Sequence, residues 1–246
     1  VDGLHLTLLQ RHYAHDYWAL EAKSFSISSD IRGEQGVYLG AEWQPHRKLQ
    51  VTAYADAYHF PYLRYRVSTP SYGTDGQLMA RYSISNNHSL MLRYRYRLKQ
   101  RDVAEGYHLP HGGLLNEWTH RFHAEWDGTL SPTLSLRALL EGTLVTAEKR
   151  STGYMGSIQA TYTPVWQGHT LRLSAGITAF DADYAARLYS YERGLLYAYN
   201  YQMYHGRGVR GYVLMQYSHI DTPRLTFTAK LGTTCYADRS SIGSGA

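Results

Sequence analysis

Apolar and polar side chains alternate along most of this chain. In residues 89–99, every even position is Leu or Tyr, whereas four of the odd positions are Arg or Lys. Alternate side chains of a β-strand point to opposite faces, while a helix would mix the two sets around its circumference. The segment is therefore predicted to be a strand with one apolar or aromatic face and one strongly basic face.

The same alternation predicts ten clear strands and a weaker one near residues 4–13. With their flanking residues the strands run over about 9–13 residues, longer than the mode of about 5–6 in soluble proteins. A tilted bilayer crossing needs about 9–11 residues, which fits this length. The clear alternations fall in residues 37–43, 49–57, 78–84, 90–98, 118–126, 134–144, 154–162, 171–179, 209–217 and 225–235.

Charged residues are confined to one face of the predicted strands. About 51 positions belong to the apolar phase and none is charged, although 18% charged content would place roughly nine there on a face of average composition. The polar phase carries the charge, with bases outnumbering acids, so the overall excess of +5 lies on it. A soluble sandwich would bury the apolar face, whereas a membrane barrel turns it to lipid and lines its interior with polar groups.

The connections between the predicted strands alternate in length. Outer-membrane barrels have short periplasmic turns and longer external loops, so the alternation favours a barrel over a sandwich. The connection at residues 148–152 is a shorter exception among the long ones. Short turns are expected at residues 44–48, 85–87, 128–132, 163–169 and 221–224, and long connections at 14–36, 61–74, 102–116 and 182–207.

Aromatic residues recur in the apolar phase close to the short turns. Each lies within about four residues of the next short turn, a depth that suits the membrane–water interface. Aromatics are also favoured in strands generally, which explains their number but not this recurrence. The predicted interface aromatics are Trp43, Tyr82, Trp126, Tyr162 and Tyr217.

These patterns predict an all-β fold, an antiparallel up-and-down transmembrane β-barrel of the bacterial outer membrane. About 11 strands are visible, and bacterial single-chain barrels have even counts, so 12 or more are expected in the complete barrel. Residues 1–246 are therefore expected to form a single, incomplete barrel domain that lacks its closing strand. The alternative architecture is a soluble β-sandwich interaction module, which would purify without detergent.

Several stretches resemble a Bacteroidota-type outer-membrane β-barrel that follows helix-hairpin-helix modules. The resemblance extends over nearly the whole chain and is strongest in "AYADAYHFPYLRYRV" and "YSYERGLLYAY". It implies a signal peptide, N-terminal modules, extra strands and a terminal strand ending in an aromatic residue, and a helix-hairpin-helix module would imply contact with nucleic acid in the periplasm. The resembling stretches are residues 4–13, 36–45, 49–67, 92–101, 189–217 and 238–245.

A ladder of basic residues is the most specific chemical feature of the predicted lumen. It indicates either a positive lumen that attracts small anionic solutes, or a polar interior in which the bases pair with acids or hold a plug; pairing is the favoured interpretation. The basic ladder is Arg81, Arg93, Arg95, Arg97, Lys99, Arg121, Arg137 and Arg172. The lumen acids are Glu42, Asp56, Glu117, Glu125 and Glu141.

The favoured function is passage of solutes through the basic lumen, or anchoring of a periplasmic module. The partners expected are outer-membrane lipid, lipopolysaccharide and small anionic solutes. Nucleic acid is disfavoured for this segment, although Tyr54 and Tyr58 are predicted to face the lumen, where aromatic rings can stack on bases. Residues 190–208 are predicted to form a long external loop or an inward-folded constriction.

An outer-membrane barrel hydrolase is the alternative function. It would need a nucleophile or acid–base group near the external rim, but the spacing of the available residues singles none of them out, so no catalytic residue is assigned. Neither His108 and His111 nor His120 and His123 has a convergent third ligand, so no metal and no cofactor is predicted. The rim residues considered are His108, Asp181, Asp183 and Ser190.

Overall fold

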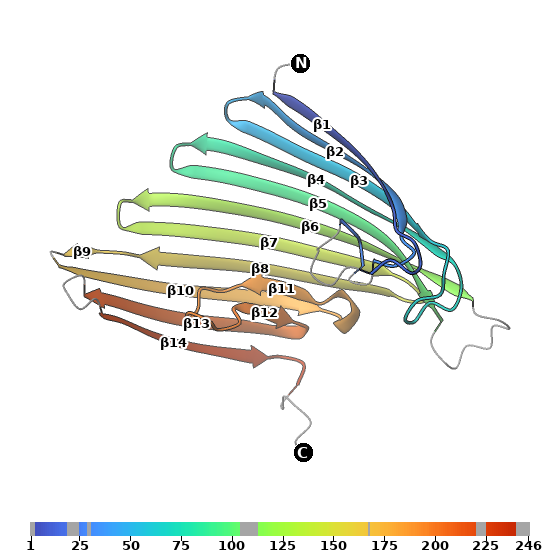
Figure 1. Ribbon diagram of the computed structural model, residues 1–246. Helices are drawn as coiled ribbons and strands as arrows, with labels where there is room; N and C mark the ends of the chain where they lie inside the picture. Colours follow the sequence, from blue (N-terminus) through green and yellow to red (C-terminus); the bar gives the residue numbers. More distant parts are fainter. Residues whose placement is uncertain are drawn as a thin grey trace. The chain divides into compact units, whose positions relative to one another are not determined.

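A computed structural model describes residues 3–18, 25–28, 31–103, 113–166, 168–219 and 225–239 (Figure 1). The described residues are almost entirely β-structure. The strands are β1 (Leu4–His12), β2 (Gln35–His46), β3 (Leu49–Phe60), β4 (Ser71–Ser85), β5 (His88–Asp102), β6 (Leu114–Ser131), β7 (Leu134–Thr146), β8 (Arg150–Tyr162), β9 (Val165–Trp166), β10 (His169–Ala182), β11 (Leu188–Tyr191), β12 (Tyr201–Tyr204), β13 (Gly206–His219) and β14 (Leu225–Tyr236). One 3-10 turn, η1 (Tyr184–Ala186), precedes β11.

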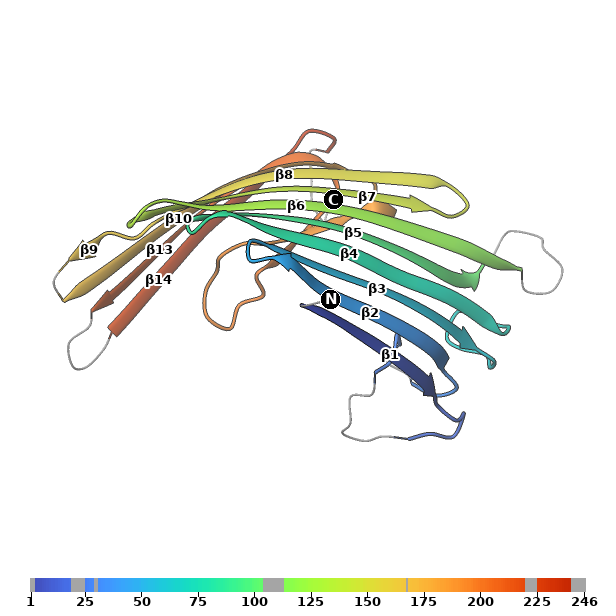
Figure 2. The ribbon, with the colours of Figure 1, turned by 90° about the horizontal axis from the view of Figure 1, so that it is seen from above.

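Eleven strands follow one another in sheet order as they do in the sequence. The order is β1-β2-β3-β4-β5-β6-β7-β8-β10-β13-β14, with the short β9 paired to β10. Figure 2 shows β10, β13 and β14 side by side, in agreement with their antiparallel pairing. This confirms an antiparallel up-and-down sheet of 11 strands; β1 and β14 are its ends and do not pair with each other among the described residues.

The strands divide between two compact units. The first unit comprises Val1–Ala80, Arg93–Arg121 and Val145–Arg150, and the second comprises Arg81–Leu92, Phe122–Leu144 and Ser151–Ala246. The first unit contains β1, β2 and β3 entire. The second contains β10 to β14, and with them the β11–β12 hairpin, which forms a separate two-stranded sheet.

The strand register aligns apolar positions with apolar positions. In the first unit, Leu8 lies opposite Leu39, which lies opposite Ala55. In the second unit, Ala175 lies opposite Val213, which lies opposite Leu231. A shift by one residue would send every side chain of a strand to the other face, so this register keeps one face of each unit apolar and the other polar.

Burial is inverted relative to an ordinary soluble sheet. The apolar face is exposed, with 74% of Leu8 and 79% of Leu231 accessible. Several residues of the polar face are buried instead, and Asp75 and Ser174 are only 1% and 2% accessible. Among the described residues the only other sheet is the β11–β12 hairpin, and it packs on the polar face of the second unit rather than on the apolar face.

Connection lengths alternate in the predicted way, with some boundaries displaced. The β2–β3 and β4–β5 turns have two residues each, 47–48 and 86–87, whereas the β10–β13 connection runs over 183–205 and contains η1, β11 and β12. β4 begins at Ser71 and β6 at Leu114, earlier than predicted, so residues 71–74 belong to a strand rather than to a loop. The turn expected at 221–224 and residues 104–112 of a long connection lie outside the described residues.

The part of the chain that the structure describes contains no helix long and apolar enough to cross a membrane.

Candidate functional site

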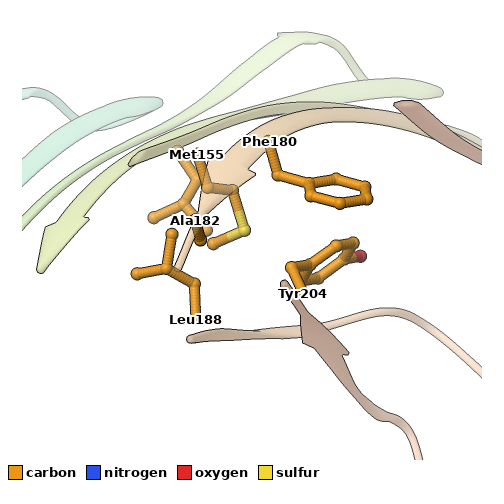
Figure 3. Close-up of a cluster of buried hydrophobic side chains, with 6 residues drawn as sticks. Met155, Phe180, Ala182, Leu188 and Tyr204 are labelled. Carbon is orange, nitrogen blue, oxygen red and sulfur yellow. The ribbon is translucent and has the colours of Figure 1, made fainter. Parts of the chain in front are cut away.

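In the second unit, the β11–β12 hairpin rests on the polar face through a small apolar cluster (Figure 3). Leu188 of β11 and Tyr204 of β12 are 2% and 1% accessible and pack against Met155, Phe180 and Ala182. These three, together with Leu139 of β7, occupy polar-phase positions. Phe180 and Ala182 lie at the end of β10, whereas Leu139 and Met155 lie in the middle of β7 and β8. The hairpin therefore packs on the polar face through apolar residues of that face.

A buried glutamate fastens the end of β11 to β13 and β14. Glu192 Oε1 accepts hydrogen bonds from Arg210 Nε at 2.6 Å and from Tyr204 Oη at 3.1 Å. Its second oxygen accepts from Lys230 Nζ at 3.0 Å. Arg210 also donates to Thr234 Oγ1 of β14 at 2.9 Å, so its guanidinium is fixed from two sides.

The pKa of Glu192 reflects two opposing effects. Burial of the carboxylate would raise its pKa, because a low-dielectric site disfavours the charged form. The hydrogen bonds and positive charges of Arg210 and Lys230 outweigh that effect, so the pKa lies below the ordinary value. The Glu192 carboxylate is therefore charged at neutral pH and remains so as the solution is moderately acidified.

An amide side chain makes a second link between the hairpin and the strands. Gln159 of β8 donates through Nε2 to the backbone oxygen of Tyr191 and accepts through Oε1 from Tyr212 Oη, both at 3.1 Å. The Tyr212 ring lies directly over Gly176, where an added Cβ would approach the ring to 2.4 Å. A glycine at this position is needed for the ring to reach Gln159.

A polar cavity of about 480 Å³ lies beside these links, within the second unit. Its lining comes from the β4–β5 turn, from β6, β7 and β8, and from the end of β11. A volume of this size falls in the range of small-ligand pockets. The lining side chains that carry or can carry charge are His88, Asp127, Arg137 and Arg193.

In the first unit, a buried aspartate holds two members of the predicted basic ladder. Asp75 of β4 accepts hydrogen bonds from Arg95 Nε at 2.9 Å and from Arg97 Nε at 2.6 Å. Tyr54 Oη donates to the same carboxylate at 3.0 Å, and Tyr58 Oη donates to the backbone oxygen of Leu98 at 3.1 Å. Both tyrosine hydroxyls are thus engaged in internal hydrogen bonds of the polar face.

A second buried network in the first unit joins the β1–β2 connection to the strands. Arg11 of β1 donates to Glu34 at 2.5 Å and makes two hydrogen bonds to the Asp56 carboxylate of β3, at 2.8 and 3.0 Å. Glu34 is fully buried and also accepts from Ser26 Oγ at 2.6 Å. Glu34 therefore ties its connection to the polar face in the same manner as Glu192 does in the second unit.

Other ladder residues have different surroundings. Arg137 Nε donates to Asp127 Oδ1 at 2.8 Å and a second guanidinium nitrogen lies 3.9 Å from Glu125. Arg81 approaches the sulfur of Met91 at 3.8 Å. Lys99 and Arg121 are exposed, and among the described residues Arg93 and Arg172 form no ion pair.

Most of the predicted acids pair with bases, and these bases lie mainly outside the ladder. Asp56 binds Arg11, and Glu117 accepts from Arg101 at 3.1 Å. Glu141 and Glu125 lie 3.9 and 3.8 Å from the two ring nitrogens of His123. Glu42 forms no ion pair within the described part of the chain.

The sequence patterns did not identify three buried acids that bind arginines, Asp75, Glu34 and Glu192. Asp75 lies between the predicted connection 61–74 and the predicted alternation 78–84, because the apolar alternation of β4 becomes clear only at Leu78. Glu34 and Glu192 lie in connections, where no periodicity marks a side chain as buried. The one indication in the sequence is an isolated acid next to an otherwise basic polar phase. Because charges are rarely buried without a partner, such an acid is expected to pair with the neighbouring bases.

The predicted interface aromatics lie on the apolar side of their strands. Tyr82, Tyr162, Tyr217 and Trp43 are exposed, and Trp126 is half-buried and stacks on His88 with ring centroids 5.6 Å apart. Tyr217 shares a hydrogen bond of 2.8 Å with His169 Nδ1 next to the β13–β14 turn. Their depth in a bilayer remains a prediction.

The remaining candidates offer no assembled chemistry. Asp183 accepts a hydrogen bond from the backbone of Thr152, Asp181 is paired with Arg207, and Ser190 is buried in β11. His108 and His111 lie outside the described residues. Within the described ranges no group of three or more His, Cys, Asp or Glu side chains is arranged to hold a metal ion.

Neither a protein-family model nor a curated protein matches this chain.

Proposed function

We propose that this chain forms part of a transmembrane β-barrel of the bacterial outer membrane, of the Bacteroidota type, whose polar interior admits small solutes past the β11–β12 hairpin. The single observation that carries the proposal is the inverted burial: an uncharged apolar face is exposed, whereas polar-face residues such as Arg11, Asp56 and Asp75 are buried. In water such an apolar surface would be an extensive exposed patch, whereas lipid covers it at no cost. A barrel in lipid needs every strand edge paired, so the proposal requires further strands to join β1 and β14.

The hairpin supports a constricted rather than a wide passage. It docks on the polar face, which is the interior face of the proposed barrel, and it is fastened there by Glu192 and Gln159. Its tip, from Gly194 to Tyr199, projects into solvent, with Leu196 and Tyr197 81% and 99% accessible. A loop held at its base and free at its tip narrows a pore without sealing it by itself.

Charge pairing supports a passage of moderate selectivity. At least three of the eight ladder bases, Arg95, Arg97 and Arg137, pair with acids, so the field of the ladder is weaker than the count of bases suggests. Anchoring a separate module is the second candidate function, and the covering of the polar face by the hairpin favours it, since an anchor needs no open interior.

Reconstitution of the full-length protein in a planar bilayer tests the proposal. A solute passage predicts stepwise ion conductance together with swelling of liposomes in small neutral sugars. A folded, membrane-inserted protein that conducts no ions and admits no sugar would overturn solute passage and leave anchoring. A protein that stays monodisperse and folded in water without detergent would overturn the membrane assignment itself.

A further inference from the structure

We infer that the polar cavity between the hairpin and strands β6, β7 and β8 is a binding site for a small oxyanion, a carboxylate or a phosphate, with Arg193 as its principal ligand. The inference deepens the proposed function by naming the class of solute that pauses beside the hairpin. The site lies entirely within the second unit, so its geometry does not depend on how the barrel closes.

The charge around the cavity is positive by one unit. Arg137 and Asp127 both line it, and their 2.8 Å ion pair makes them neutral together. Arg193 lines it as well, and its guanidinium forms no ion pair or hydrogen bond with any other described side chain. A guanidinium presents a planar fork of donors that matches two oxygens of a carboxylate or phosphate, so an unpaired fork facing a cavity favours an oxyanion.

The rest of the lining supplies neutral polar groups rather than competing carboxylates. Thr161, Ser135 and Ser89 contribute hydroxyls, and Asn87 contributes an amide. Hydroxyl and amide donors orient an anion that an arginine attracts. Apart from Asp127, which Arg137 already engages, no acidic side chain lines the cavity.

The placement of Arg193 depends on the docking of the hairpin. Arg193 follows directly after Glu192, whose carboxylate is held by Arg210 and Lys230. Tyr191, just before it, is fixed through its backbone oxygen by Gln159, which itself lines the cavity. The same contacts that dock the hairpin therefore hold Arg193 over the cavity, and an anion bound there favours the docked state.

Calorimetric titration of the full-length protein in detergent at low salt tests the inference, with citrate and inorganic phosphate as probes and glucose as the neutral comparison. We expect saturable binding of at least one anion and none of glucose. Arg193→Gln should weaken that binding about tenfold or more, because it removes a charge-assisted hydrogen-bonding group. The affinity of the Arg193→Lys variant should lie between those of the unmodified protein and the Arg193→Gln variant, because lysine keeps the charge but lacks the planar fork of donors.

Arg207→Gln is the matched control, because it removes the same charge from an exposed residue that is paired with Asp181 and does not line the cavity. It should leave anion binding unchanged. Glu192→Gln should weaken binding while Arg193 is still present, because it releases the segment that carries the arginine. Equal weakening by the Arg193 and Arg207 variants, or no anion binding at all, would overturn the site.

Anion binding and ion conductance are measured separately, so the binding site and the solute passage can be rejected independently of each other. Anion binding that depends on Arg193 in a protein that conducts no ions would retain the site and reject solute passage. Conductance without Arg193-dependent binding would retain the passage and reject the site.

Discussion

Arg210 Nε lies 2.6 Å from Glu192 Oε1 and joins the polar face of β13 to the end of the hairpin strand β11. The carboxylate is 1% accessible and the guanidinium 17%, so the pair is shielded from water on the side of the carboxylate. Lys230 completes the arrangement from β14. Removal of the acid would leave two cations facing a hairpin that keeps only its apolar contacts and the Gln159 link.

Glu192→Gln should release the hairpin and raise single-channel conductance. The amide keeps the size of the side chain but loses its charge-assisted hydrogen bonds, which are worth about 1.5–3 kcal/mol to the docked state. Planar-bilayer recordings of the variant measure the effect. Glu148→Gln, in an exposed turn of the first unit, is the control and should conduct as the unmodified protein does.

Acidification should release the hairpin of the unmodified protein only at strongly acidic pH. The pKa of Glu192 is lower in the folded protein than the ordinary value of about 4.3 for glutamate. Its contribution is therefore complete above the ordinary value and is lost as the pH falls through the lowered one. Conductance measured from pH 7 to pH 3 should rise at the acid end, and the Glu192→Gln variant should lack that step.

Arginine placed on the apolar face should destabilise the inserted protein. Substitution of Ala53, Leu92, Leu136 or Ala175 by Arg should cost about 2–4 kcal/mol each where the residue lies near the bilayer midplane. Urea titration of the protein in liposomes measures the free energy of unfolding. Gln216→Arg, on the polar phase of β13, should be tolerated, and equal tolerance of all four apolar-face variants would contradict an outward apolar face.

Arg11→Ala should destabilise the first unit strongly. The substitution leaves the Glu34 and Asp56 carboxylates buried without their cation, and such a loss costs about 3–5 kcal/mol. The same urea titration reports it. Arg207→Ala breaks an exposed pair instead and should change stability by less than about 1 kcal/mol.

Asp75→Asn should shift the ion selectivity of the passage toward anions. It removes the charge that compensates Arg95 and Arg97 but leaves an oxygen that can still accept from Tyr54. The reversal potential in a gradient of KCl measures the shift. Asp181→Asn, which neutralises an exposed acid, should leave the reversal potential unchanged.

The alternation of side chains predicted the strands and their order well. Each alternating segment keeps its charges on one face, and short turns allow only antiparallel neighbours, so the up-and-down sheet follows from local information. Boundaries were less certain where polar residues continue a strand, as at Ser71–Gln77 of β4. There the strand is held by pairing with its neighbours rather than by its own pattern.

The partners of the charged residues were decided by the tertiary structure. The alternation predicts that Arg95 faces a polar interior. Its acceptor Asp75 lies in the first part of β4, which the apolar alternation does not mark as a strand. Glu34 and Glu192 lie in long connections. The path of such a connection across a sheet depends on the buried groups with which its side chains form hydrogen bonds. No periodicity in the sequence indicates which side chains distant along the chain will pair.

The sequence by itself determined which face of each strand is apolar, because side chains alternate strictly along an extended backbone. Only the tertiary structure decided that the apolar face is the exposed one, and that residues 183–205 fold back over the polar face. The physical reason is that alternation is a local property of the chain, whereas burial depends on which surfaces meet. Here the hairpin meets the polar face, where Glu192 finds two cations and where Leu188 and Tyr204 find the few apolar positions that can receive them.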